Sequence, residues 1–330
     1  MCGKVSWATR MLSVLARVIY IGAVLLAPSA VVAQTIRSIG ILGDTPGPQW
    51  DVFRNALADL GYLEGRNVAF VSRYSQGNSA RFIELATELV NSGVEIIAVE
   101  GGVATRAAKD ATSSIPIVMT IVGDPVGSGL VVSLANPGGN ITGSTSLAFD
   151  LTAKQLQLLK ELLPALTSVA FLWNPEETFH ARAIPQVEAA ARALKVSLVM
   201  VEARNLLEIS AAFQKLEGNR LGAVLILPTT NLDAQQSQIG ELAIKHHLPA
   251  LYNKPQFCKT GGLICFGARY FDFFQRAAIY VDKILNGAKP ESLPVQQPTV
   301  YDLVLNLRTA KALGTPVPNS ILVRADEVIE

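Results

Sequence analysis

The sequence has few of the residues on which most catalytic and metal sites depend. Its 330 residues include three cysteines and three histidines, and no Cys-x-x-Cys pair or zinc-like Cys/His spacing occurs. His246 and His247 are adjacent, so on a helix they point about 100° apart and do not share a metal readily. The P-loop, the nucleophile elbow and the His-Glu-x-x-His motif are also absent. We therefore expect neither an enzyme nor a bound cofactor or metal.

Charge is also scarce, and it is evenly balanced. Only 17% of the residues are charged, and the formal net charge is +1. No basic run with interleaved aromatic residues occurs, so a nucleic-acid partner is not expected. Half of the residues are hydrophobic, which argues against disorder. Because single cores stop growing at about 250–300 residues, the length predicts two domains.

Long apolar runs are confined to the N-terminus. Three basic residues, the last of them Arg17, precede the apolar residues 18–27, and residues 31–33 offer small side chains for cleavage before Gln34. A membrane-spanning helix needs about 20 apolar residues, and Pro28 interrupts this run. We predict a cleaved signal peptide over residues 1–33 and a periplasmic protein, with an uncleaved anchor as the alternative. No cysteine lies directly after the candidate cleavage site, so a lipid anchor is not expected.

Cleavage would leave Cys258 and Cys265 in an oxidising compartment. They can form a disulfide if their Cα atoms come within about 7 Å of each other. The alternative is two free cysteines that pack as small buried side chains, one on a helix and one on a strand. The sequence leaves both open and slightly favours the free cysteines.

From residue 37 onward, short apolar runs alternate with helical patterns. Strands are expected at residues 38–42, 68–71, 95–99, 115–122, 169–173 and 300–305, and helices at 50–60, 80–90, 103–111, 179–194, 271–285 and 309–313. Pro185 indicates that the helix at 179–194 either kinks or begins near Ala183. Strands separated by helices indicate parallel sheets. Because the pattern restarts after about residue 145, the sequence predicts two similar α/β lobes with a crevice between them.

The strand ends of the first half supply candidate ligand-binding residues, because open α/β sheets bind ligands beyond the carboxyl ends of their strands. Asp124 follows a predicted strand and could accept hydrogen bonds from the ammonium group of an amino acid. The alternative is an Asx turn ahead of Pro125. Gly101 and Gly102 open a helix whose N–H groups suit a carboxylate, and Thr105 could add a hydroxyl. Close packing of strand and helix is the other interpretation of these glycines.

Further candidates lie at equivalent turns of the two halves. They are Asp44, Thr45, Asn174, Thr229, Thr230, Asn231, Gly267 and Tyr270. The amide and hydroxyl groups would offer neutral hydrogen bonds, and Tyr270 would offer a ring to an apolar ligand. For Thr230 and Asn231, capping of the following helix is the alternative.

Five segments carry a resemblance to a known family. They are GYLEGRNV at 61–68, GDPVGSGLVVSLANPGGNITG at 123–143, FLWNPEE at 171–177, YVDKILNGAKPESLPVQQPT at 280–299, and LNLRTAKALGTPVPNSILVRADEVIE at 305–330. Together they resemble the extracytoplasmic substrate-binding proteins of ABC transporters, in the subfamily whose members include receptors for aromatic amino acids. The resemblance runs from about residue 36 to the end.

The resemblance implies a type I periplasmic binding fold, an α/β fold of two Rossmann-like parallel-sheet lobes joined by a hinge. It implies about three crossings between the lobes, whereas the repeat alone would indicate one. We expect residues 36–145 plus about 270–298 in one lobe, and 146–269 plus about 299–330 in the other.

The function implied is that of a monomeric receptor that closes on an amino acid or related small carboxylate. It would deliver this ligand to the permease subunits of an ABC importer. An extracytoplasmic sensing module for a signalling receptor would have the same fold and is the alternative.

Overall fold

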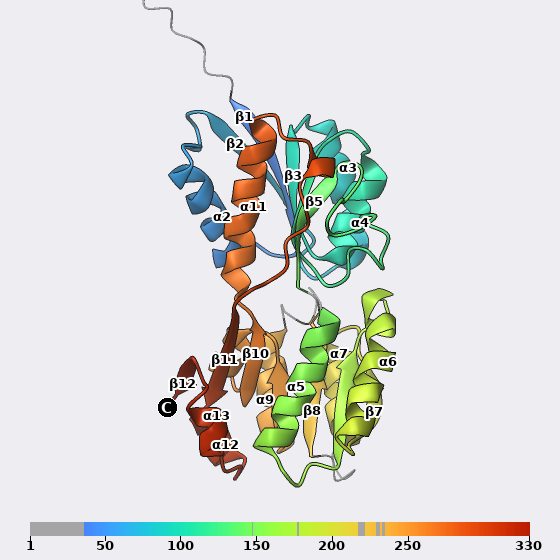
Figure 1. Cartoon of the computed structure of the whole chain (residues 1–330), viewed down its shortest axis with the longest axis vertical. Helices are drawn as coiled ribbons and strands as arrows, with labels where there is room; N and C mark the ends of the chain where they lie inside the picture. Colours follow the sequence, from blue (N-terminus) through green and yellow to red (C-terminus); the bar gives the residue numbers. More distant parts are fainter. Residues whose placement is uncertain (1–35, 147, 177, 217–221, 229–231, 233–234) are drawn as a thin grey trace, which may run out of the picture. The chain divides into compact units, whose positions relative to one another are not determined.

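The computed structural model describes residues 36–330 apart from 147, 177, 217–221, 229–231 and 233–234 (Figure 1). The predicted signal peptide therefore lies outside the described residues. Two β-sheets organise this part of the chain, with strand orders β2-β1-β3-β4-β5 and β12-β11-β10-β9-β8-β6-β7. No helix within the described ranges is both long and apolar enough to span a membrane.

The first sheet is parallel throughout. Its strands are β1 (Arg37–Gly43), β2 (Val68–Tyr74), β3 (Ile96–Glu100), β4 (Ile117–Val122) and β5 (Ile141–Thr145). Every residue of β3 and β5 is buried, as expected for strands covered on both faces. The four strands predicted in this half are confirmed.

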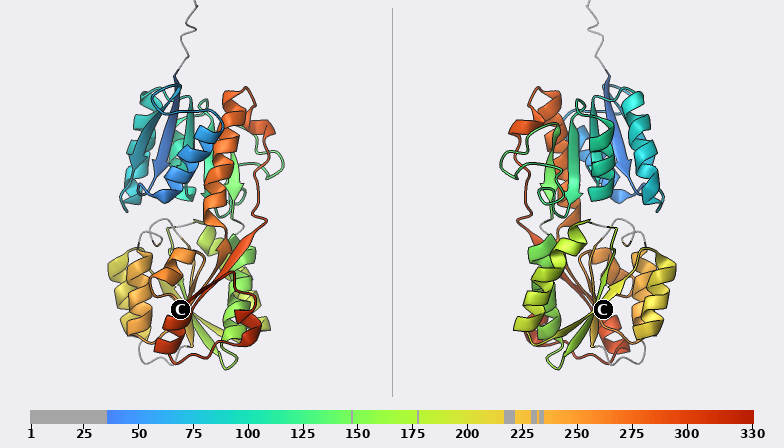
Figure 2. Two further views of the ribbon diagram at one scale, coloured as in Figure 1. Left: turned by 90° about the vertical axis from the view of Figure 1, so that its left-hand side faces the viewer. Right: turned by 90° about the vertical axis from the view of Figure 1, so that its right-hand side faces the viewer.

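Helices cover both faces of the first sheet (Figure 2). On one face lie α2 (Pro48–Asp59) and, from much later in the chain, α11 (Tyr270–Leu285). On the other lie α3 (Phe82–Asn91) and α4 (Gly102–Ala111). Trp50 packs its ring against Phe53 and Phe274, with ring centroids 5.8 Å and 5.2 Å apart. This contact between α2 and α11 fixes the later helix to the first sheet.

Two large apolar residues of the helices predicted at 50–60 and 271–285 are not in the core. Leu60 and Phe271 are each 43% exposed. Leu60 lies beyond the last residue of α2, where the chain turns through Gly61 at a φ of 95°. Phe271 lies in the first turn of α11, beside a cavity. Both lie at helix ends, where the apolar face is no longer covered by the sheet.

The second sheet is mixed. Its strands are β6 (Ser168–Trp173), β7 (Ser197–Glu202), β8 (Ala223–Ile226), β9 (Ala250–Tyr252), β10 (Ile264–Ala268), β11 (Tyr301–Asn306) and β12 (Glu327–Ile329). β10 and β11 pair antiparallel, and the other pairs are parallel. The exception arises because the chain reaches β11 only after α11, from the direction of the first sheet.

Helices cover both faces of the second sheet as well. One face carries α5 (Ala148–Leu162), α6 (Thr178–Ala193), α12 (Leu307–Ala312) and α13 (Asn319–Leu322). The other carries α7 (Leu206–Leu216), α9 (Gln236–Lys245) and α10 (Pro255–Lys259). Pro185 lies inside α6, which begins at Thr178. A helix start near Ala183 is therefore wrong.

Cys258 of α10 and Cys265 of β10 form a disulfide, with their Cα atoms 6.0 Å apart. Both residues are fully buried. The free-cysteine interpretation is therefore wrong, although burial of both residues is confirmed. Burial and disulfide formation are compatible here, because a short helix that packs on the strand following it brings the two side chains together inside the core.

The chain passes between the two sheets three times. It leaves the first sheet after β5, returns from β10 to α11, and leaves again after Gln296, which bridges to Ser144 of β5. We call the first sheet with α2, α3, α4, α11 and residues 286–296 the first lobe. The second sheet with its helices is the second lobe, and residues 297–300 form the third passage.

Candidate functional site

A cavity of about 500 Å³ is lined by residues of both lobes. Asp44 follows β1, and Glu100 is the last residue of β3, whereas Lys254 follows β9 in the second lobe. Each strand carries a buried apolar run toward its end, and each of these three residues is the first charged residue after that run. The cavity therefore lies at the carboxyl ends of parallel strands, as expected for an α/β fold.

Asp44 is held in one orientation by its neighbours. Its Oδ1 accepts hydrogen bonds from the Ser75 hydroxyl and from the Gly77 backbone N–H, the latter at 2.7 Å. Asp44 is only 5% exposed, and its Oδ2 is buried without a hydrogen-bond partner among the described residues. A buried carboxylate oxygen without a donor is costly. A ligand with N–H donors would remove that cost.

Tyr270 connects the two lobes at the cavity. Its hydroxyl donates a hydrogen bond to Oε1 of Glu100, and the Lys254 ammonium lies 3.8 Å from the centroid of its ring. Glu100 and Lys254 are 6% and 9% exposed. Tyr270 is the first residue of α11, directly after the passage from β10. One side chain thus contacts a carboxylate of the first lobe and an ammonium of the second.

Two other cations of the cavity wall are paired with carboxylates. Arg269 donates from Nε and Nη2 to Oδ1 of Asp302, at 3.2 Å and 3.0 Å, and this hydrogen bond raises the pKa of Arg269 above its usual value. The ammonium of Lys259 lies 3.3 Å from Glu327.

The lining as a whole is balanced in charge. It contains the carboxylates of Asp44, Glu100 and Asp302 and the cations Lys254, Lys259 and Arg269, beside the rings of Tyr270 and Phe271. Such a lining suits a zwitterion with an apolar or aromatic part. No group of three or more His, Cys, Asp and Glu side chains in the described ranges is placed to hold a metal ion.

The cavity brings together three of the residues selected from the sequence, namely Asp44, Thr45 and Tyr270. Thr229, Thr230 and Asn231 lie outside the described residues. The other six candidates are not among the lining residues, and their local surroundings are described next.

In the first lobe these contacts are local. Gly101 has a φ of 89° and begins α4, and the fully buried Thr105 donates its hydroxyl hydrogen to the Gly101 carbonyl. Gly102 is the first residue of α4. Asp124 accepts a hydrogen bond from the Gly127 N–H at 2.8 Å, the contact that an Asx-type turn makes.

In the second lobe, Gly267 allows a close backbone approach, because a Cβ atom there would lie 1.8 Å from the Asn253 carbonyl oxygen. The side chain of Asn174 accepts a hydrogen bond from the Glu176 N–H at 2.9 Å. The Asn174 N–H itself donates to Nδ1 of His180, also at 2.9 Å.

His180 joins two strand-end loops of the second lobe. It is fully buried, and its Nε2 lies 3.1 Å from the Pro228 carbonyl oxygen. Burial lowers the pKa of His180 to about 4, so the ring is neutral at pH 7. In that form Nδ1 accepts from Asn174, which follows β6, and Nε2–H donates to Pro228, which follows β8.

The sequence interpretation missed Glu100 and Lys254. A signal was present at both positions, because each is the first charged residue after an apolar run, and Glu100 immediately precedes the Gly101-Gly102 pair.

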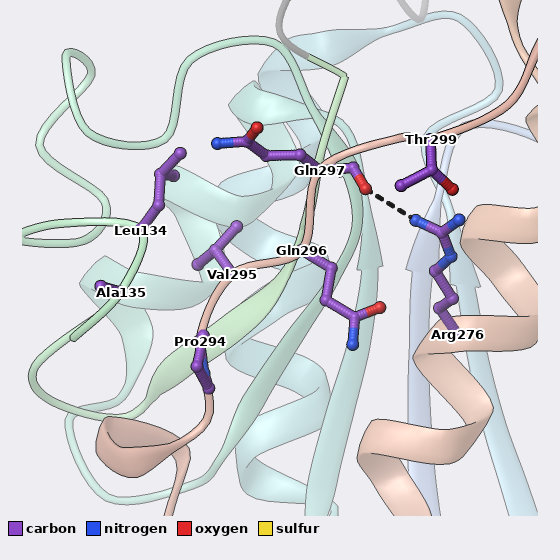
Figure 3. Close-up of a pocket in the computed structure, with 8 residues that line it drawn as sticks. All are labelled: Leu134, Ala135, Arg276, Pro294, Val295, Gln296, Gln297 and Thr299. Atoms are coloured by element: carbon purple, nitrogen blue, oxygen red, sulfur yellow. Dashed lines mark hydrogen bonds between the residues drawn. The ribbon is translucent and has the colours of Figure 1, made fainter.

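A second opening, of about 680 Å³, lies beside the third passage (Figure 3). Its charged lining residue is Arg276 of α11, whose Nη1 donates to the Gln297 carbonyl oxygen at 2.9 Å. Leu134, Pro294 and Val295 form apolar walls. No lining residue belongs to the second lobe, so the smaller cavity, which both lobes line, is the better candidate for a ligand site.

Known proteins resemble this chain over most of its length. The profile of the family described as "ABC transporter substrate binding protein" matches residues 43–329. A tyrosine-binding protein of Clostridioides difficile (strain R20291) is 28% identical over 263 residues, which cover 79% of this chain and 75% of that protein.

Solved structures agree with this match. A conserved domain protein from Vibrio cholerae superimposes with a TM-score of 0.83 at 27% identity, over 89% of this chain and 100% of that one. An ABC domain from Streptococcus pneumoniae in complex with L-Trp gives a TM-score of 0.82 at 22% identity, with the same coverage. The fold is the type I periplasmic binding fold, and the family consists of solute-binding proteins rather than enzymes.

Proposed function

Because the chain belongs to the family of ABC transporter substrate-binding proteins, we propose that it binds an aromatic amino acid in the cavity lined by both lobes. We propose further that it is exported by a cleaved signal peptide at residues 1–33 and, as a monomer, delivers this ligand to the permease of an ABC importer. The relatives that support the ligand class are the tyrosine-binding protein and the L-Trp complex.

The observation that carries the proposal is the composition of the cavity wall. Equal numbers of acidic and basic side chains suit a ligand with one charge of each sign, and Tyr270 and Phe271 suit an aromatic side chain. The volume of about 500 Å³ lies within the range of about 300–1,000 Å³ typical of small-molecule sites.

Binding would couple to lobe closure. A ligand that contacts both lobes stabilises the arrangement in which the lobes are together, because only that arrangement provides all of its contacts. Three passages of chain join the lobes and would form the hinge. The closed, liganded form is then the one that the permease distinguishes from the empty form.

Isothermal titration calorimetry on residues 34–330 tests the ligand class. L-Tyrosine, L-tryptophan and L-phenylalanine are compared with L-leucine, L-glutamate and glucose. We expect at least one aromatic amino acid to bind at least roughly 100-fold more tightly than the non-aromatic solutes, a difference of about 2.7 kcal/mol. Preferential binding of glucose or L-glutamate would contradict the proposal.

The transport role needs a separate measurement. Uptake of the radiolabelled ligand is followed in cells with and without the gene, and complementation restores it. Loss of uptake on deletion supports delivery to a permease. Unchanged uptake in the deletion strain, with binding intact in vitro, would contradict the transport role and leave binding in place.

A further inference from the structure

We infer that the ligand lies across the cavity in one polarity, with its ammonium group on Asp44 of the first lobe and its carboxylate on Lys254 of the second. This inference rests on the proposed function, because it concerns an amino acid in the same cavity. It adds which lobe binds which charge. The two residues would then be the specificity-determining residues for a zwitterion.

Asp44 is suited to an ammonium group by its fixed orientation. Ser75 and Gly77 both donate to Oδ1, so the carboxylate is held from one side and cannot rotate without losing two hydrogen bonds. Oδ2 is buried and has no hydrogen-bond partner among the described residues. A charge-assisted bond from an ammonium group is about twice as strong as a neutral one, and the low exposure of Asp44 keeps water from competing for it.

Glu100 is a poorer choice for the ammonium group. Its Oε1 accepts the Tyr270 hydroxyl, so binding a ligand there would compete with a contact that the protein already makes. Asp302 is engaged by two nitrogens of Arg269. Among the three carboxylates of the cavity wall, Asp44 is the one with a buried oxygen that has no hydrogen-bond partner among the described residues.

Lys254 is suited to the carboxylate by position and burial. It follows β9 at the strand-end edge of the second lobe and is 9% exposed. Its ammonium lies 3.8 Å from the centroid of the Tyr270 ring. The side chains of Lys259 and Arg269 are 47% and 50% exposed, so Lys254 is the cation of the cavity wall that water screens least. A hydrogen bond from such a shielded ammonium to a carboxylate is charge-assisted and therefore strong.

The polarity has a consequence for closure. Asp44 belongs to the first lobe and Lys254 to the second, so a zwitterion would bond to both lobes through its two charges. A ligand that lacks either charge would bond strongly to one lobe only. The assignment therefore predicts that both charges of the ligand are required for tight binding.

The test combines two variants with ligands that lack one charge. The probes are L-tyrosine, tyramine, which lacks the carboxylate, and 3-(4-hydroxyphenyl)propionate, which lacks the amino group; if only L-tryptophan binds, its corresponding analogues are used. Asp44→Asn should weaken the binding of L-tyrosine at least roughly 30-fold but the binding of the propionate less than about 3-fold. Lys254→Met should weaken the binding of L-tyrosine as strongly but the binding of tyramine less than about 3-fold.

Two controls make the same charge changes outside the cavity. Asp51→Asn alters a carboxylate on α2 that pairs with Arg54. Lys283→Met removes a lysine that also lies over a tyrosine ring, that of Tyr280 at 5.6 Å. Neither residue lines the cavity, so both variants should bind L-tyrosine within about 3-fold of wild type.

The outcomes separate this inference from the function on which it rests. Suppose that the wild type binds L-tyrosine or L-tryptophan, but that Asp44→Asn weakens binding of the analogue without an amino group as much as binding of the amino acid itself. The polarity is then overturned and the function stands. The polarity is also overturned, and the function also stands, if Asp44→Asn weakens binding of L-tyrosine but leaves binding of tyramine unchanged. If wild type binds no aromatic amino acid, the function fails and the polarity falls with it.

A comparison on the wild-type protein keeps the test valid if a variant does not fold. Tyramine and the propionate should each bind at least roughly 30-fold more weakly than L-tyrosine. If tyramine binds within about 3-fold of L-tyrosine, the assignment of the carboxylate to Lys254 is overturned. If the propionate does so, the assignment of the ammonium group to Asp44 is overturned.

Discussion

The two lobes present their strand ends to the cavity in different ways. In the first lobe, Asp44 is held by hydrogen bonds from Ser75 and Gly77, contacts that a neutral amide in its place could still accept. In the second lobe, the strand ends are held by a buried disulfide, by His180 between two loops, and by the close approach of Gly267 to Asn253. A change of Asp44 to an amide should therefore alter ligand binding more than stability, whereas changes at the disulfide, at His180 or at Gly267 should alter stability.

Glycine substitutions at the two edges should differ most. In Gly267→Ala, the new Cβ would lie 1.8 Å from the Asn253 carbonyl oxygen, so the backbone of the second lobe must move. We expect a loss of about 3 kcal/mol or more in the free energy of unfolding. Urea denaturation followed by circular dichroism measures it.

Gly102→Ala is the matched control in the first lobe. The nearest atom to its Cβ would be a Val122 methyl carbon at 3.9 Å, so the methyl group fits, and a gain of up to about 1 kcal/mol is expected from the unfolded state. Equal losses for the two variants would remove the distinction between the edges.

Acid should destabilise the second lobe through His180. The folded-state pKa of about 4 lies below the ordinary histidine value of 6.5, so the unfolded state binds the proton first. The contribution to stability is full above pH 6.5 and is lost as the pH falls toward 4, by a total of about 3 kcal/mol. The wild type should therefore lose about that much more stability between pH 7 and pH 4 than His180→Gln does.

Hydrogen exchange can localise this loss. All three histidines of the sequence lie in the second lobe, so amides of β6 and β8 should lose protection before those of β1 and β3. An identical pH profile for wild type and His180→Gln would show that protonation of His180 does not limit stability.

The smallest effect is expected at Asp124. Its contact with the Gly127 N–H predicts that Asp124→Ala costs about 1 kcal/mol of stability, while the dissociation constant for the ligand changes less than about 3-fold because the residue does not line the cavity. Calorimetry and thermal melting on the same variant measure both. A tenfold loss of affinity at unchanged melting temperature would return Asp124 to the binding site.

Local patterns were sufficient to predict the order of elements. Strand β3 and helix α4 follow from an apolar run, a glycine pair and a helical repeat, all within about 17 residues of sequence, because such signals depend on neighbours along the chain. The place of α11 could not be read in this way. Its packing on α2 through Trp50 and Phe274 joins residues far apart in sequence, and the repeat alone indicated one crossing where the structure has three.

The site was less predictable than the fold for the same reason. A position at the end of a strand predicted Asp44, Thr45 and Tyr270, which line the cavity, but it also predicted Asp124, which does not. Asp44 is further distinguished by hydrogen bonds from Ser75 and Gly77, which lie about 30 residues away and leave its second oxygen without a partner among the described residues. Likewise, the contact of Lys254 with Tyr270 depends on how two lobes meet, and no local pattern encodes that.

The most direct test is a crystal structure of residues 34–330 with the aromatic amino acid that calorimetry selects. The account predicts the ligand in the cavity lined by both lobes, with its ammonium group within hydrogen-bond distance of Asp44 and its carboxylate at Lys254. A ligand bound in the opening beside Arg276, or in this cavity with its two charges exchanged, would contradict it.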